Sequence, residues 1–142
     1  MRHPGRVLGY GFATWIIALA ISFVAYPLKK AGDPLFETIM TLVLTTLAIS
    51  STMLRFRGLT SGFVREGVLL GVAMLLVNLV LDQPLFLAGP MAMPFVAYMK
   101  DIGLTYLVYP IVAVGTGVLL HGLVRAPAQA ALPEADTEPV PS

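Results

Sequence analysis

Four stretches of this chain are both apolar enough and long enough to cross a lipid bilayer. They cover residues 7–28, 35–54, 63–87 and 102–124. A helix that spans the hydrocarbon core needs about 20 mostly apolar residues, and each stretch is close to that length. None of them alternates polar and apolar residues, as a strand of a membrane barrel does. The sequence therefore predicts an all-α polytopic membrane protein with four transmembrane helices in an antiparallel bundle.

The composition favours lipid over water as the solvent of this chain. Of its 142 residues, 57% are hydrophobic and only 12% are charged. Soluble domains carry about 25% charged residues. With half that charge, a protein of this size would expose an apolar surface to water, whereas a bilayer accepts such a surface. We therefore expect the lipid bilayer as a partner and the cell inner (plasma) membrane as the location.

Several classes of chemistry lack the residues that they need. The net charge of +1 gives no basis for nucleic-acid binding. The absence of cysteine excludes disulfides, iron–sulfur clusters and thiolate zinc sites. No metal-ligand spacing, catalytic triad or phosphate-binding glycine loop is present. We expect no cofactor, no metal and no catalytic residue. An enzyme acting on lipids or quinones is the last alternative, because no nucleophile–base pair is visible.

The orientation follows from the distribution of basic residues between the two sides of the predicted bundle. Lys29, Lys30 and Lys100 fall on one side. Six arginines fall on the other side: Arg2, Arg6, Arg55, Arg57, Arg65 and Arg125. Because loops rich in lysine and arginine stay in the cytoplasm, we expect both termini there. The even number of spans agrees with this orientation.

Two segments outside the spans have unusual compositions. Residues 126–142 are rich in proline and alanine and are acidic, which predicts a disordered cytoplasmic tail after a transmembrane domain of residues 1–125. Residues 83–100 connect the third and fourth spans with almost no polar side chain. Two interpretations of this segment remain open, interfacial or re-entrant. Pro110, in the middle of the fourth span, predicts a kink there.

Acidic side chains within or beside the spans are the main candidates for a site. Such residues are costly in lipid and often mark function. Under the predicted orientation, the candidates gather near the extracytoplasmic face. They are Glu37, Asp82, Asp101, Tyr106 and Tyr109.

Asp82 is the most informative of these candidates, because its negative charge near a helix C-terminus opposes the helix dipole. It needs a cationic partner such as Lys29, Lys30 or Lys100, or a bound proton. Glu37 and Asp101 are ordinary residues for the first turn of a helix. Two interpretations therefore remain open for the cluster, an ion or proton site and a structural lock.

The second span carries a stripe of hydroxyl groups. Glu37, Thr41 and Thr45 are spaced four residues apart and share one helix face. They either line a narrow polar path or pack between helices, with each threonine bonding its own helix backbone.

Glycines indicate where helices approach closely. Gly67 and Gly71 form a Gly-x-x-x-Gly pair in the third span, and Gly115 and Gly117 lie in the fourth. Such residues permit close helix packing in membranes. The contact lies within the bundle, with a second copy of the chain, or with another membrane protein.

Three sequence segments carry a resemblance to other proteins. They are LFETIM in the second span, and LDQPLFLAGPM and YMKDIGLTYLVYP from residue 81 to residue 110. They resemble a group of small four-span membrane proteins of bacteria and archaea with no known activity. The resemblance covers the four helices but neither end of the chain, and it implies a four-helix membrane fold without a function.

Two functions follow from these patterns. The sparse chemistry favours a structural or accessory subunit of the membrane, with the glycines as its packing surface. The alternative is a small oligomeric transporter or channel coupled to cations or protons. Its extracytoplasmic site would consist of Glu37, Asp82 and Asp101, with Tyr106 and Tyr109 lining it.

Overall fold

A computed structural model describes residues 4–89 and 91–130 of the chain, with helix as the regular structure. The long helices are α1 (Pro4–Lys30), α2 (Leu35–Phe56), α3 (Phe63–Ala88) and α5 (Val108–Ala130). Two short elements separate α3 from α5: α4 (Phe95–Asp101) and the 3-10 helix η1 (Gly103–Leu107). Four helical segments are long and apolar enough to cross a membrane. The described part of the chain contains no strand, so the predicted all-α class is confirmed.

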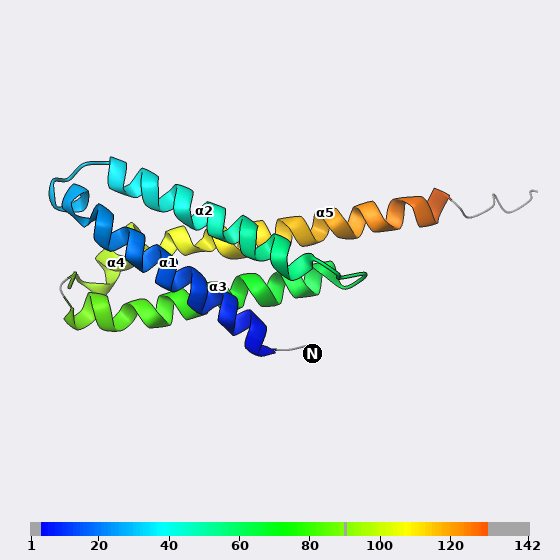
Figure 1. Ribbon diagram of the computed structural model, residues 1–142, viewed down its shortest axis with the longest axis horizontal. Coiled ribbons are helices and arrows are strands. Elements are labelled where there is room, and N and C mark those ends of the chain that lie inside the picture. The colour runs from blue at the N-terminus through cyan, green and yellow to red at the C-terminus, as the bar shows by residue number, and fades with distance from the viewer. Residues whose placement is uncertain (1–3, 90, 131–142) are drawn as a thin grey trace, which may run out of the picture.

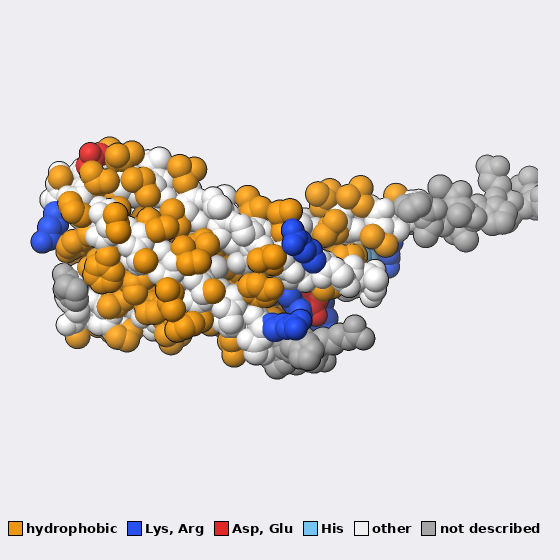
Figure 2. Space-filling model, viewed as in Figure 1, with side chains coloured by type: hydrophobic (Ala, Val, Ile, Leu, Met, Phe, Trp, Pro, Cys, Tyr) orange, Lys and Arg blue, Asp and Glu red, His pale blue; other side chains and the backbone are white. Residues whose placement is uncertain are grey.

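The long helices run antiparallel in chain order (Figure 1). The start of α1, the 57–62 connection and the end of α5 lie at one end of the bundle, which we call the Arg55 end. The α1–α2 turn and α4 lie at the opposite end, the Asp82 end. Around the bundle, α1 contacts α2 and α3, and α5 contacts the same two helices. Figure 2 shows hydrophobic side chains over most of the visible surface and charged side chains near the two ends.

The packing glycines close a contact within the chain. A Cβ atom at Gly67 or Gly71 of α3 would overlap the backbone of Ala113 or Pro110 on α5. A Cβ atom at Gly117 would lie 2.7 Å from the Phe63 carbonyl oxygen. Three of the four predicted glycines therefore hold α3 against α5 and are not available to a partner. The fourth, Gly115, is exposed, and an added Cβ there would meet nothing within 4 Å.

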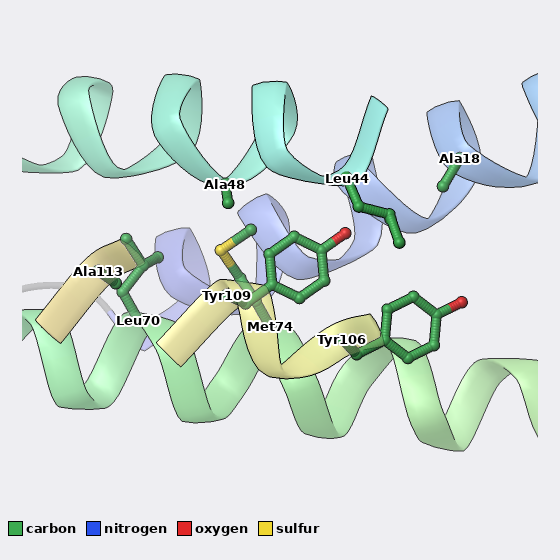
Figure 3. Close-up of a cluster of buried hydrophobic side chains, with 8 residues drawn as sticks. All are labelled: Ala18, Leu44, Ala48, Leu70, Met74, Tyr106, Tyr109 and Ala113. Atoms are coloured by element: carbon green, nitrogen blue, oxygen red, sulfur yellow. The ribbon is translucent and has the colours of Figure 1, made fainter. Parts of the chain in front are cut away.

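The core lies between the four long helices (Figure 3). Leu70 of α3 and Tyr109 and Ala113 of α5 are completely buried. The rings of Tyr106 and Tyr109 stack, with centroids 6.0 Å apart. The remaining buried members of this cluster are Ala18, Leu44, Ala48 and Met74.

The fourth predicted span begins differently from a continuous helix. It starts as η1 and becomes α-helical only at Val108. The sequence placed Pro110 in the middle of the fourth span, but the structure places it in the first turn of α5. The first turn accepts proline, because its N–H groups have few helical partners. At the other end, α5 continues to Ala130. Residues 131–142 of the predicted tail lie outside the described residues, so their disorder stays a prediction.

The segment between α3 and α5 folds back on the bundle. α3 continues through Pro84 to Ala88, and the Met93 N–H then donates a 2.9 Å hydrogen bond to the Phe86 carbonyl. The ring of Tyr98 on α4 packs on Phe86, with centroids 4.9 Å apart. This return of the chain carries Tyr98 to the end of α3, next to Asp82.

Candidate functional site

Asp82 is buried among three aromatic hydrogen-bond donors. The indole N–H of Trp15 donates to Asp82 Oδ1 over 2.9 Å. The hydroxyl of Tyr98 donates to Oδ2 over 2.9 Å, and that of Tyr106 donates to the same oxygen over 2.5 Å. Only 4% of Asp82 is exposed. Both carboxylate oxygens are therefore held by the protein inside the bundle.

Each donor comes from a different element. Trp15 lies on α1, Tyr98 on α4 and Tyr106 on η1, while Asp82 is on α3. Asn78, one helical turn before Asp82, directs another buried polar side chain toward α1, where its amide lies 3.4 Å from the Thr14 hydroxyl. The α1–α3 contact is thus polar along one stripe, and this stripe ends at Asp82.

The donors are neutral groups. Burial, followed by the nearby Asp82 charge, raises the pKa of Tyr98, so its hydroxyl keeps its proton and stays a donor. Among the described residues, no lysine, arginine or histidine pairs with Asp82; the ion pairs there are Lys29–Asp101 and Arg55–Glu66. Of the two alternatives for Asp82, a lysine partner is therefore wrong for the described residues. Aromatic donors take that place.

A cavity of about 160 Å³ adjoins this carboxylate. It lies at the Asp82 end. Residues from α1, α2, α3, α4 and η1 line it, together with Met91 from the turn between α3 and α4. Its polar lining consists of Ser22, Glu37, Thr41, Asp82, Asp101, Thr105 and Tyr106. Its main apolar and aromatic lining consists of Trp15, Leu19, Phe36, Met40, Phe86, Met91 and Ile102.

Lys29 lies beside this cavity and touches two residues of its wall. Its ammonium is 2.5 Å from Asp101 Oδ2 and 5.1 Å from the centroid of the Phe36 ring. Because Phe36 lies in the first turn of α2 and Asp101 ends α4, this lysine joins three elements around the cavity. Asp101 is therefore the last residue of α4 and part of an ion pair, and not a helix N-terminal residue as expected from the sequence.

The structure brings together most of the predicted site residues. Glu37, Asp82, Asp101 and Tyr106 all line the cavity. Glu37 is in the first turn of α2, as predicted, but it is exposed and makes no ion pair among the described residues. Tyr109 does not line the cavity; it is fully buried in the core beside Tyr106.

The sequence alone did not select two residues of this site, Trp15 and Tyr98, and it gave Lys29 only as a possible partner of Asp82. The available signal was the polar atom of an aromatic ring within or next to an apolar stretch, since the N–H of tryptophan and the O–H of tyrosine find partners when buried. That signal marks the donor but does not identify its acceptor.

Within residues 4–89 and 91–130, no group of three histidine or acidic side chains is arranged to hold a metal ion.

Comparison of the chain with known protein families, with curated proteins and with solved structures finds no match in any of the three. The resemblance to small bacterial and archaeal four-span proteins therefore stays an expectation.

Proposed function

We propose that this small integral membrane protein is a cation transporter whose site is the cavity at the Asp82 end. The observation that carries the proposal is the placement of Asp82. It is a buried carboxylate with no cationic partner in the described chain, and it faces a cavity that also carries Glu37 and Asp101. Acidic groups within a membrane bundle are retained at a cost and mark cation or proton pathways.

The cavity reaches the surface at the Asp82 end and is bordered by packed side chains toward the Arg55 end. Glu37, Thr41 and Asp101 line it and are exposed. Toward the Arg55 end, it meets the buried cluster of Figure 3, where Ala48, Leu70 and Ala113 follow Leu44 and Tyr106. A site open to one side and closed to the other is the arrangement that alternating access requires.

The threonine stripe of α2 contributes little to a path. Thr41 reaches the cavity, but its hydroxyl donates to the Glu37 carbonyl over 2.8 Å. Farther along α2, outside the stripe, the Thr52 hydroxyl donates in the same way to the Ala48 carbonyl, over 2.7 Å. Such bonds satisfy the hydroxyl within its own helix. A carrier that rearranges, and not a fixed channel through one chain, is therefore the form of transport that we propose.

Flux measurements in liposomes test this function. The full chain is reconstituted, and the movement of protons, Na⁺ and K⁺ is followed with ion-sensitive dyes. We expect cation flux in the parent protein and its loss in Asp82→Asn and Glu37→Gln. Glu66→Gln is the matched control, because it removes one carboxylate at the Arg55 end and should leave the flux unchanged. Absence of flux in the parent, or equal flux in all variants, rules the proposal out.

A second candidate is a structural or accessory subunit, and the triple hydrogen bond favours it. A carboxylate that joins α1, α4 and η1 to α3 locks the bundle without any ligand. In this function, Asp82→Asn lowers the thermal stability, the parent carries no flux, and loss of the protein changes the assembly of a partner complex in native gels of the membrane. An unchanged set of membrane complexes argues against it.

The orientation and the oligomeric state belong to the same proposal. The excess of arginine at the Arg55 end supports termini in the cytoplasm, so that the cavity faces the opposite side. Labelling of a single cysteine introduced at Ser61, in the 57–62 connection, by a reagent that does not cross the membrane tests this directly. Labelling in intact cells contradicts the orientation. Cross-linking in the membrane tests for a homo-oligomer.

A further inference from the structure

The wall of the cavity at the Asp82 end combines negative charge with an apolar surface. Among the residues that line it, three are acidic and none is basic. One of the three, Asp101, already holds Lys29. The other two, Asp82 and Glu37, make no ion pair among the described residues. The field in the cavity therefore favours a positively charged occupant.

Lys29 displays how an ammonium group binds at this wall. Its Nζ atom lies against the carboxylate of Asp101 and over the ring of Phe36. A carboxylate and an aromatic face together are the pair of groups that recognise alkylammonium ions, because the ring quadrupole attracts the cation. Both residues line the cavity. The side chain of Lys29 thus occupies a site for which an external ammonium ion would compete.

The rest of the lining fits carbon better than a bare ion. Trp15, Leu19, Met40, Phe86 and Ile102 contribute apolar surface. A hard metal cation needs several oxygen ligands around it, and the described residues contain no acidic or histidine group of that kind. The volume of about 160 Å³ is close to that of an apolar cavity of about 150 Å³ that binds benzene in another protein.

We propose that the cavity binds a small organic ammonium ion, with its charge against the carboxylates of Glu37 and Asp82 and its carbon skeleton against the apolar wall. The proposal rests on the function given above and names the class of cation. Glu37, at the rim, meets the ammonium group as it enters. Asp82, at the inner wall, attracts it through the one lone-pair direction that its three donors leave open. Lys29 competes with it for Asp101 and Phe36.

Binding of benzylammonium to the full chain in detergent tests this inference. Isothermal titration calorimetry compares benzylammonium with benzyl alcohol, which has nearly the same shape without the charge. We expect saturable binding of the ammonium and at least about tenfold weaker binding of the alcohol, because the alcohol loses a charge-assisted contact. Equal affinities for the two probes, or no binding of either, overturn the inference.

Two pairs of variants locate the site. Lys29→Met frees Asp101 and Phe36 and should tighten benzylammonium binding several-fold, whereas Lys30→Met should not, because Lys30 contacts Tyr26 instead. Glu37→Gln should weaken binding about tenfold, and Glu66→Gln should leave it unchanged. Binding that responds equally to both lysine changes, or to both glutamate changes, contradicts a site at this cavity.

The outcome also separates this inference from the proposed function. Benzylammonium binding without flux of benzylammonium, protons, Na⁺ or K⁺ in liposomes retains the ligand class and rejects transport. Flux of protons, Na⁺ or K⁺ that depends on Asp82, without benzylammonium binding, retains transport and rejects the organic ammonium. Loss of both rejects both.

Discussion

The hydroxyl of Tyr106 donates a 2.5 Å hydrogen bond to Asp82 Oδ2, across 24 residues of sequence. This bond ties the 3-10 start of the last long helix to the end of α3. The same carboxylate oxygen accepts the Tyr98 hydroxyl. Asp82 therefore holds both short elements that follow α3, namely α4 and η1. Stability measurements can test its importance.

Removal of a tyrosine hydroxyl that donates to Asp82 should lower the stability of the protein. Hydrogen bonds to charged groups contribute about 1.5 to 3 kcal/mol, so Tyr106→Phe and Tyr98→Phe should each lower the unfolding temperature in detergent by several degrees. The double variant leaves only the Trp15 donor and should lose more than the sum of the single changes, because the charge is then poorly compensated. An unfolding temperature equal to that of the parent in both single variants contradicts this role.

Trp15 should report on Asp82 by its fluorescence. It is the single tryptophan of the chain, and its indole N–H contacts the carboxylate. Negative charge beside the indole nitrogen shifts the emission to longer wavelength, so Asp82→Asn should shift the emission maximum to shorter wavelength. Glu66→Gln, at the Arg55 end, should leave the spectrum unchanged. A spectrum that is identical in Asp82→Asn and the parent means that the indole does not contact this acid.

A methyl group at the α3–α5 contact should be costly. Gly71→Ala places a carbon against the Pro110 backbone, and such overpacking costs about 1 to 3 kcal/mol. Gly115→Ala is the control on the exposed face of α5. It should be neutral or slightly stabilising, because alanine favours a helix over glycine by roughly 0.5 to 1 kcal/mol. Thermal unfolding of the two variants measures the difference, and an equal response of both contradicts the close contact.

The Arg55–Glu66 ion pair should couple the ends of α2 and α3. The structure places the Arg55 guanidinium 2.5 Å from Glu66 Oε2. A double-mutant cycle with Arg55→Gln and Glu66→Gln should give a coupling energy of up to about 1 kcal/mol, because both side chains are partly accessible. A cycle with strictly additive effects excludes the coupling.

Local composition was sufficient to predict the long helices but not the element between them. The predicted starts at Leu35 and Phe63 are those of α2 and α3, because each span is a local run of apolar residues. The short α4 and η1 were not predicted. Their formation depends on the return of the chain after Ala88, where Met93 and Tyr98 find their partners on Phe86. Such contacts join separate segments, so the residues of one helix do not predict them.

The candidate site was predicted in part for the same reason. An acid in an apolar run is visible in the sequence, so Asp82 and Glu37 were found. Its partners are not visible, because several lysines and several aromatic donors lie near the same end of the bundle. Lys29 was one possible partner of Asp82 and instead binds Asp101. Tyr109 was expected to line the site and instead packs in the core.

The amino-acid sequence alone thus determined the solvent, the number of spans and the depth at which acids occur, since these depend on the free energy of transferring each segment into lipid. The tertiary structure alone decided which groups face Asp82, which lysine pairs with an acid of the cavity wall and which glycines remain exposed. These depend on the rotation of each helix about its axis and on the fold of α4, which are determined by packing between segments far apart in the chain.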